Sequence, residues 1–554
     1  MTEVSVPGWR RAVIYQVYIR SFADGDGDGL GDIAGLRARL PYLAGLGVDA
    51  IWINPWYPSP MADAGYDVSD YRAVEPRFGT LADAEALVRE AHDLALRVLL
   101  DIVPNHTSDE HPWFRAAVAA GPGTAERARY IFRPGTGPAG DQPPNNWLSV
   151  FGGPAWRRVT EADGRPGEWY LHLFAPQQPD LNWDNPDVRA DFDETLRFWF
   201  DRGVDGFRID VANSLVKHAD LPDLEVPGDH GPLADGSEHP HWDRSEVHEI
   251  FREWRRVADD YPDPRVFVAE AWVDRPERLA RYVRADELHT AFNFDFLRAP
   301  WIAERLRATI DETMAEHAVV GAPPTWVLSN HDVARHVSRL ARPQTGVSLR
   351  SLDDLIALDA PADLGVGLRR ARAAALLMLA LPGGAYIYQG EELGLPEVED
   401  LPDDLLEDPT WERSDHTQRG RDGARVPIPW SGDQPPFGFS PNGAPAPPWL
   451  PQPSSWRANT AAALENNPDS ILHLYRDALR IRHDHPALGD GNLRWLDAPD
   501  GVLLFARDPG FVAAVNISGA PVPLPEGTRV LLASGPLTAG NEIPADTAVW
   551  LTTT

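Results

Sequence analysis

VDGFRID (204–210) is a short apolar run that ends in a polar residue, and short apolar or β-branched runs recur along the chain. Segments with i, i+3, i+4 apolar spacing, such as 36–47 and 83–96, lie between the runs and are typical of helices. Alternating strands and helices predict parallel strands with helical crossovers, and eight strands predict an α/β protein built on a (β/α)8 TIM barrel. The other seven runs are IYQVYIR (14–20), AIWINP (50–55), RVLLDIV (97–103), VFVAEAW (266–272), TAFNFDF (290–296), TWVLSNHD (325–332) and AYIYQGEE (385–392).

Three intervals interrupt this alternation and define the predicted domains. Residues 105–173 are rich in Pro, Gly and aromatic residues, which predicts an irregular subdomain inserted after the third strand. The Pro-rich, acidic segment of about 396–465 is expected to be a long loop after the eighth strand. Short alternating runs from about residue 487 predict a C-terminal antiparallel β domain. The expected division is 1–104 and 174–486 for the barrel, 105–173 for the inserted subdomain and 487–554 for the C-terminal domain.

The composition excludes several classes of partner. The net charge of −32 would repel phosphate backbones and anionic lipid, so neither nucleic acid nor a membrane is an expected partner, whereas a neutral ligand is indifferent to it. No apolar run approaches the ~20 residues of a membrane helix. Cysteine is absent, which excludes disulfides and thiolate metal sites, and MTEVSVPGWRRAVIYQ (1–16) lacks a signal-peptide pattern. We therefore expect a cytoplasmic protein, of an oligomeric state that the sequence leaves open.

Polar residues gather where the predicted strands end. Asp101 lies near the carboxyl end of run 97–103 and Asn105-His106 just beyond it, and the carboxyl ends of runs 204–210, 266–272 and 325–332 carry Asp210, Glu270 and Asn330-His331-Asp332. Barrel enzymes build their active sites at the carboxyl ends of the strands. This arrangement predicts a catalytic site at that end.

The residues at these positions form ordered motifs. DIVPNH (101–106), GFRIDVAN (206–213), EAW (270–272) and SNHD (329–332) occur together with QPDLN (178–182), GVDAIWINP (47–55) and GGAYIYQGEE (383–392). In this order and spacing they resemble the α-amylase family, glycoside hydrolase family 13, over the whole chain. The resemblance implies a retaining hydrolase with Asp210 as nucleophile, Glu270 as acid/base and Asp332 as a third carboxylate that holds sugar hydroxyls.

The chemistry agrees with this assignment, because glycoside hydrolysis needs one ionised and one protonated carboxyl group. Arg208 lies two residues before Asp210 and so projects from the same strand face, where it would keep Asp210 ionised.

The resemblance also implies residues that bind the substrate. Asp67 in GYDVSDY (65–71) matches a position that binds the terminal glucose, with Tyr66 beside it. His106 and His331 match positions that hydrogen-bond the same sugar. Arg421 resembles the arginine that pairs with the equivalent of Asp67, although the segment RDGARVPIPW (421–430) leaves Arg425 as an alternative.

DGDGDGLGD (24–32) places acids on a Gly-rich turn, a pattern that suits a hard cation. An EF-hand is excluded because Gly35 stands at the twelfth position. The family has a similar loop that holds a structural Ca²⁺, or alternatively Mg²⁺; a solvated acidic turn remains the alternative. The implied ligands are Asp24, Asp26, Asp28, the Leu30 carbonyl and Asp32.

QPDLN indicates the oligo-1,6-glucosidase-like branch, whose members are exo-acting. We expect hydrolysis of maltose, short malto-oligosaccharides and isomalto-oligosaccharides, all neutral α-glucosides, with Val211 after the nucleophile implying α-1,6 activity. The alternatives are a glucosyltransferase or isomerase resembling trehalose synthase, and a non-catalytic ancillary subunit. The Arg-Leu-Asp-Arg-Asp segment of sucrose isomerases is absent, and the single lysine, Lys217, does not indicate a phosphorylated substrate. Preferences for linkage and chain length stay open.

Overall fold

The computed structural model describes residues 8–229, 233, 237–273, 275–343 and 360–553. Residues 1–7, on which part of the expectation about a signal segment rests, lie outside this part of the chain. Across the described residues, no helix combines the length and the apolar character needed to cross a bilayer.

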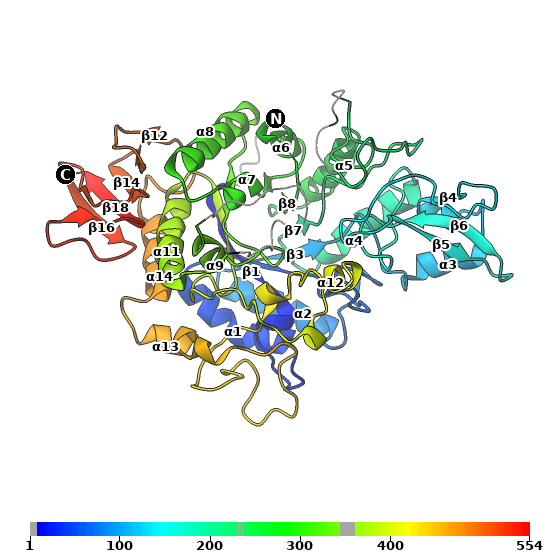
Figure 1. The fold of residues 1–554 in the computed structure, drawn as a ribbon, viewed down its shortest axis with the longest axis horizontal. Coiled ribbons are helices and arrows are strands. Elements are labelled where there is room, and N and C mark those ends of the chain that lie inside the picture. Colours follow the sequence, from blue (N-terminus) through cyan, green and yellow to red (C-terminus); the bar gives the residue numbers. More distant parts are fainter. Residues whose placement is uncertain (1–7, 230–232, 234–236, 274, 344–359, 554) are drawn as a thin grey trace.

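Eight parallel strands form the central sheet and confirm the predicted barrel (Figure 1). They are β1 (Val13–Val17), β2 (Ala50–Ile53), β3 (Arg97–Ile102), β7 (Gly206–Ile209), β8 (Val266–Ala269), β9 (Thr290–Ala291), β10 (Thr325–Val327) and β11 (Gly384–Tyr388). Neighbours follow the order β10-β11-β1-β2-β3-β7-β8-β9. Across the remaining gap, the backbone N–H of Asn293 donates to the carbonyl of Thr325 at 3.1 Å, so the barrel is nearly closed.

Helices surround these strands, and local sequence fixes where several of them begin. Asp32 caps α1 by accepting from the N–H of Gly35, and Thr80 with Asp83 forms a capping box at α2. Gly47 ends α1 with φ of 95°, a conformation that glycine adopts freely. The helices of the barrel are α1 (Ile33–Leu46), α2 (Leu81–Asp93), α4 (Pro186–Phe200), α5 (Val247–Asp259), α6 (Pro276–Tyr282), α7 (Phe294–Arg298), α8 (Ala303–Val320), α9 (His336–Leu340), α11 (Leu364–Ala380) and α14 (Ile471–Asp484).

The sixth run forms a shorter strand than TAFNFDF suggested. Only Thr290–Ala291 is extended, because the side chain of Asn293 accepts from the N–H of Phe296 and starts α7 there. The apolar residues that follow therefore pack from a helix, not from a strand.

The insertion predicted after the third strand is present between β3 and β7, and it contains a small antiparallel sheet where the sequence suggested only irregular structure. The sheet has the order β4-β6-β5 and projects from the barrel on the right of Figure 1. Its elements are α3 (Pro112–Ala120), a 3-10 turn at Arg127–Arg129, β4 (Phe132–Arg133), β5 (Trp156–Thr160) and β6 (Pro166–Leu171).

The chain ends in the predicted antiparallel β sheet, drawn in red in Figure 1. Trp550 ties this sheet to the barrel, because its indole N–H donates to the carbonyl of Leu376 in α11 at 3.0 Å. The sheet has the order β12-β13-β14-β18-β16, from strands β12 (Arg494–Trp495), β13 (Val502–Arg507), β14 (Phe511–Asn516), β16 (Thr528–Ala533) and β18 (Thr547–Thr553), and β15 (Val522–Pro523) pairs with β17 (Glu542–Ile543).

The segment between β11 and α14 carries only short helical turns. They are η4 (Asp403–Leu405), α12 (Pro409–Arg413), η5 (Asp422–Arg425), η6 (Ser454–Asn459) and α13 (Ala461–Glu465). Arg425 lies in η5 and Arg421 directly precedes it, so this segment carries both arginines to the site described next.

Candidate active site

The predicted acids meet at the carboxyl ends of three adjacent strands. Asp101 lies in β3, opposite Arg208 of β7 in the parallel register. Asp210 follows directly after β7 and Glu270 directly after β8. Each of these four side chains is buried.

Arg208 is the centre of this group. One terminal nitrogen lies 2.7 Å from Oδ1 of Asp101 and 2.7 Å from Oδ1 of Asp210, and the other lies 2.6 Å from Oε2 of Glu270. A single guanidinium therefore contacts three carboxyl groups and fixes their positions relative to one another.

One positive charge cannot balance three negative charges away from water. Burial raises the pKa of Asp101 to about 7, against the opposing charge of Arg208. Burial, with the neighbouring Glu270 and Asp101, also raises the pKa of Asp210 above its usual value, although Arg208 opposes this. Asp101 and Asp210 therefore take up a proton at a higher pH than solvent-exposed carboxyl groups would, which departs from the expectation that Arg208 keeps Asp210 ionised.

Two further donors hold Glu270. The backbone N–H of Val211 donates to Oε2 at 3.0 Å, and the indole N–H of Trp272 donates to Oε1 at 3.0 Å. Val211 has φ of 43°, a left-handed conformation that a β-branched residue rarely adopts and that costs roughly 1–3 kcal/mol. The chain thus bears backbone strain where the nucleophile candidate meets the acid/base candidate.

Asp332 has a different environment, dominated by positive charge. Its Oδ1 is 2.9 Å from Nη1 of Arg421 and 3.2 Å from Nη2 of Arg425, and its Oδ2 is 3.2 Å from Nε2 of His331. Burial alone would raise the pKa of Asp332, but these neighbours outweigh it and hold the pKa below its usual range. Asp332 is therefore ionised at neutral pH.

Arg421 pairs with Asp63, and this corrects the expected pair with Asp67. Its Nη2 lies 2.8 Å from Oδ1 of Asp63. The buried carboxyl of Asp67 instead accepts from the hydroxyl of Ser59 at 2.9 Å and from the N–H groups of Ala62 and Asp63 at 2.9 and 3.0 Å. Both oxygens of Asp67 thus hold the turn together, and burial raises its pKa to about 6.

The geometry also distinguishes the two arginines that the sequence left open. Arg421 contacts Asp63, Asp332 and Asp408, and its guanidinium lies 5.0 Å over the ring of Phe151. Arg425 contacts Asp332 and the carbonyl of His331, at 3.0 Å for the latter. Arg421 is the one that connects Asp332 to the loop of Asp63.

Tyr66, His106 and His331 all lie in the site. The ring of Tyr66 stacks on that of His331 with centroids 5.3 Å apart, and its hydroxyl donates to Oδ2 of Asp101 at 2.9 Å. His106 contacts the carbonyl of Tyr66 at 3.2 Å, and burial lowers its pKa to about 4, so its ring is neutral. His331 contacts the amide of Gln16 in β1 at 2.8 Å.

Four residues of the site were absent from the sequence prediction. Asp63 stands four positions before Asp67, and Gln178 of QPDLN donates to its Oδ2 at 3.0 Å. Asp408 is fully buried, and the charges of Arg421 and Arg425 lower its pKa to about 2 although burial opposes this. Trp272 closes the EAW motif. Only Asp408, within the Pro-rich segment, had no pattern that could have revealed it.

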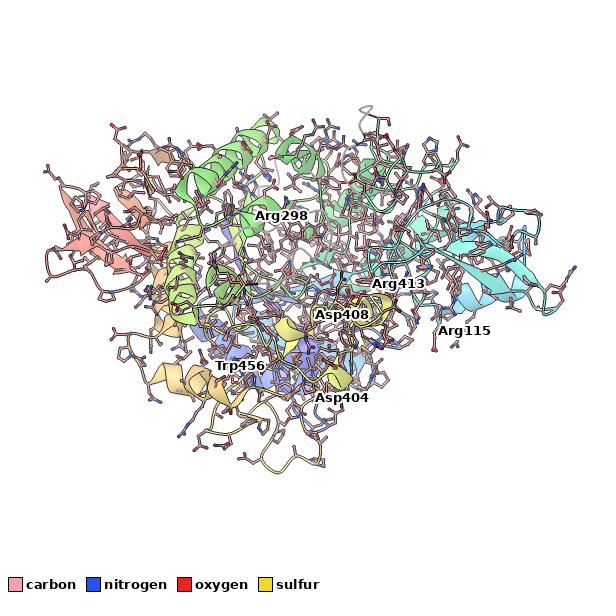
Figure 2. All side chains as sticks on the ribbon, viewed as in Figure 1. Arg115, Arg298, Asp404, Asp408, Arg413 and Trp456 are labelled. Atoms are coloured by element: carbon pink, nitrogen blue, oxygen red, sulfur yellow. The ribbon has the colours of Figure 1, made fainter. Side chains whose placement is uncertain are left out.

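A contact between two irregular segments borders the site. Nε of Arg413, at the end of α12, donates to the carbonyl of Gly152 in the inserted subdomain at 2.7 Å. Figure 2 shows Asp408 and Arg413 together, between the barrel and the projecting sheet. Asp408, at the start of α12, binds Arg421 of the site. The first end of α12 therefore contacts the site, and its last residue, Arg413, contacts the inserted subdomain.

The acidic turn brings three of its predicted ligands together. Asp24, Asp26 and Asp28 place carboxylate oxygens within 4.8 Å of one another, and such a set could hold a metal ion. Asp32 lies outside this group of three, because its oxygens accept from the N–H groups of Gly35, Gly25 and Asp26 at the start of α1.

Comparison with known proteins agrees with this geometry. The family profile described as the catalytic domain of alpha amylase matches residues 16–491. The chain belongs to the α-amylase family, glycoside hydrolase family 13.

Similar proteins of known name indicate which enzymes of the family this chain resembles. It is 39% identical to a probable alpha-glucosidase of Rhizobium meliloti over 517 residues, which cover 91% of this chain and 87% of the relative. It is 36% identical to an oligo-1,6-glucosidase of Parageobacillus thermoglucosidasius over 507 residues, or 86% and 84% of the two chains. The protein is accordingly an α-glucosidase-like enzyme of this family.

Solved structures include other activities on the same fold. An alpha-glucosyl transfer enzyme superposes with a TM-score of 0.85 at 35% identity and covers 99% of this chain and 100% of its own. A trehalulose synthase variant superposes with a TM-score of 0.83 at 31% identity and the same coverage.

Proposed function

We propose that this family member is an exo-acting, retaining α-glucosidase that releases α-glucose from the non-reducing end of neutral α-glucosides. The observation that carries the proposal is the contact of one guanidinium, Arg208, with both Asp210 and Glu270. Retaining enzymes hold their two carboxyl groups about 5–5.5 Å apart, and a shared guanidinium favours such close spacing over the wider inverting arrangement.

The reaction proceeds in two steps at these groups. First, the Asp210 carboxylate attacks the anomeric carbon while the bond to the leaving oxygen breaks, and Glu270 gives its proton to that oxygen. Then Glu270 takes a proton from water, the oxygen of this water bonds to the anomeric carbon, and the bond to Asp210 breaks. Two inversions return the α configuration.

The ionised Asp332 and the Asp63–Arg421 pair are suited to hold the terminal sugar. Carboxylates and a guanidinium bind hydroxyl groups through charge-assisted hydrogen bonds. The arginine bridge from Asp332 to Asp63 and the bridge from Arg413 to Gly152 place side chains across one end of the site. This arrangement supports a pocket that accepts a chain end, in keeping with the alpha-glucosidases among the relatives.

The cations near the site support a neutral substrate. Lys217 has a side chain 2% exposed and is paired with Asp180 at 2.7 Å, so it is not free to bind a phosphate. Arg208, Arg421 and Arg425 are each engaged with carboxylates.

Asp24, Asp26 and Asp28 would hold a structural Ca²⁺ or Mg²⁺, with the Leu30 carbonyl as a further oxygen ligand. Such an ion would supply charge neutralisation to an acidic turn and stabilise the native chain by binding it alone.

A glucosyltransferase or isomerase is the second candidate, because the superposed structures include an alpha-glucosyl transfer enzyme and a trehalulose synthase. These reactions share the first step and differ in the acceptor. Incubation with maltose, isomaltose, maltotriose, trehalose and sucrose distinguishes them. Hydrolysis of maltose releases two glucose molecules for each bond broken and forms no new saccharide. Transfer releases only the leaving glucose and forms a new saccharide, and isomerisation forms a new disaccharide without net release of glucose.

Two substitutions test the roles of the acids. Glu270→Gln should nearly abolish maltose hydrolysis, since general acid catalysis typically supplies roughly 10²–10⁴-fold, but should spare glucosyl-enzyme formation from p-nitrophenyl α-glucoside. Asp210→Asn should abolish both reactions. Proton NMR of the wild type should show α-glucose before mutarotation; initial β-glucose would overturn the retaining mechanism.

A further inference from the structure

Among the residues that the structure describes, the partners of the Glu270 carboxyl leave one of its hydrogen-bonding positions open. A carboxylate offers about two lone-pair sites on each oxygen. Oε2 accepts from Arg208 and from the N–H of Val211, at 2.6 and 3.0 Å, so both of its sites are used. Oε1 accepts from the indole of Trp272 at 3.0 Å and keeps one site. A proton carried by Glu270 therefore belongs on Oε1, beside the indole.

The indole itself is held by several neighbours. Its ring stacks on Phe294, with the centroids 3.6 Å apart and the planes 1° from parallel. Its backbone N–H donates to Oδ1 of Asn213 at 3.2 Å, and its carbonyl accepts from the amide of Asn213 at 3.3 Å and from the indole of Trp242 at 2.7 Å. Segments after β7, β8 and β9 thus combine to aim one N–H at one carboxyl oxygen.

We propose that Trp272 is a positioning residue for Glu270, whose indole N–H fixes Oε1 as the oxygen that exchanges its proton with the leaving group. The inference rests on the proposed role of Glu270 as acid/base and adds to it a specific oxygen and the device that selects it. With the N–H in place, the carboxyl presents one open site in one direction; without it, Oε1 has two.

The charged groups around Glu270 contact its other oxygen, Oε2, or act through Arg208, and so do not replace the hydrogen bond from Trp272. Arg208 and Asp210 face it from β7 and Asp101 faces it from β3, and all three contact each other through the guanidinium. Arg208 contacts Oε2 of Glu270, and Asp101 and Asp210 contact Arg208. The Trp272 indole donates to Oε1, so its loss removes stabilisation of the ionised carboxylate on the side that Arg208 does not contact.

Trp272→Phe tests the proposal, because a phenyl ring keeps an aromatic surface against Phe294 and removes the N–H donor together with part of the ring. The ionised carboxylate loses a hydrogen bond in this variant, so the alkaline limb of the kcat/KM profile should move to higher pH by about one unit or more. Hydrolysis of maltose at the pH optimum should fall about tenfold, whereas release of p-nitrophenol should change less than threefold. An unshifted alkaline limb, or equal losses on both substrates, would overturn the proposal.

A matched control separates this effect from general loss of packing. Trp326 is a buried tryptophan in β10 whose indole donates to the carbonyl of Pro382 at 2.7 Å, at the far end of the strands. Trp326→Phe should lower the melting temperature and leave the pH profile and the ratio of the two substrates unchanged. The same pH shift in this control would assign the effect in Trp272→Phe to folding.

A second measurement needs no Trp272 variant. In ¹⁵N-tryptophan-labelled wild type, one indole signal should titrate with the alkaline limb of activity, and it should stop titrating in Glu270→Gln. If no indole signal follows that limb, Trp272 does not report on Glu270 and the proposal is wrong. If Glu270→Gln affects maltose and p-nitrophenyl α-glucoside equally, the acid/base assignment itself fails, which is a different outcome.

Discussion

Exchanging Asp63 and Asp67 for asparagine, one at a time, separates the residue that faces the site from the residue that holds the turn. Both are buried, both lie in one loop, and both substitutions remove one negative charge with almost no change in shape. Asp63→Asn alters a group that contacts Arg421 and Gln178. Asp67→Asn alters a group whose partners all lie within its own turn.

The hydrogen-bond partners of Asp63 determine the expected loss of kcat/KM and of stability in Asp63→Asn. If Asp63 holds a sugar hydroxyl, one charge-assisted hydrogen bond is lost, or about 1.5–3 kcal/mol. At about 1.4 kcal/mol per factor of ten, kcat/KM for maltose should fall roughly 10- to 150-fold. Stability should change little, because Arg421 keeps Asp332 and Asp408 as partners.

Asp67→Asn should show the opposite balance. Its amide NH₂ has to face an N–H or a hydroxyl donor, so at least one hydrogen bond is lost and a buried donor is left unpaired, costing about 1–3 kcal/mol of stability. Activity of the folded fraction should fall less than tenfold. The assay is kcat/KM on maltose beside urea unfolding for both variants. A larger loss of kcat/KM in folded Asp67→Asn than in Asp63→Asn would refute the assignment.

Four further outcomes are expected. Asp408 has a pKa of about 2, below the ordinary unfolded value near 4, so its ion pairs add stability that is complete above about pH 4 and is lost as the pH falls toward 2. Asp408→Asn should therefore flatten the acid dependence of urea unfolding between pH 7 and 3, and parallel curves would contradict this. Exhaustive chelation should lower the melting temperature through loss of the ion at residues 24–28; an unchanged melting temperature with no metal by elemental analysis would exclude a structural ion. Val211→Thr should lower the ratio of isomaltose to maltose hydrolysis, and an unchanged ratio would remove Val211 as a determinant of linkage. Arg413→Ala, which frees the carbonyl of Gly152, should raise KM for maltose several-fold with little change in kcat, and an unchanged KM would show that this bridge does not shape the pocket.

The fold was accessible from the sequence because buried parallel strands read as apolar runs. Seven of the eight runs mark strands of three to six residues, and their polar residues fall at the carboxyl ends where the site forms. The sixth run was misleading at its end, since Asn293 can cap a helix as readily as it can follow a strand. The spacing of apolar residues alone does not show whether the strand continues after Asn293 or a helix begins there.

The limits of the sequence prediction lie in the loops. Asp63 and Asp67 are four residues apart in one turn, and only the path of the backbone decides which of them meets Arg421. Asp408 reaches the site from a Pro-rich segment more than 300 residues away from Asp63 or Asp101, on a loop without a repeating pattern. Trp272 was visible in the EAW motif, but its donation to Glu270 depends on the stack with Phe294.

The two halves of the site differ in how much positive charge each carboxyl group receives, and this difference assigns their tasks. Around Arg208, three carboxyl groups share one guanidinium, and burial raises the pKa of Asp101 to about 7 and the pKa of Asp210 above its usual value, so these groups take up a proton more readily than exposed carboxyl groups. Around Asp332, two guanidinium groups face one carboxylate, which stays ionised. Environments that push pKa values apart separate proton transfer from electrostatic stabilisation. In the proposed mechanism, the half around Arg208 would supply the proton for the leaving oxygen, while the ionised Asp332, whose charge two guanidinium groups balance, would bind hydroxyl groups of the sugar.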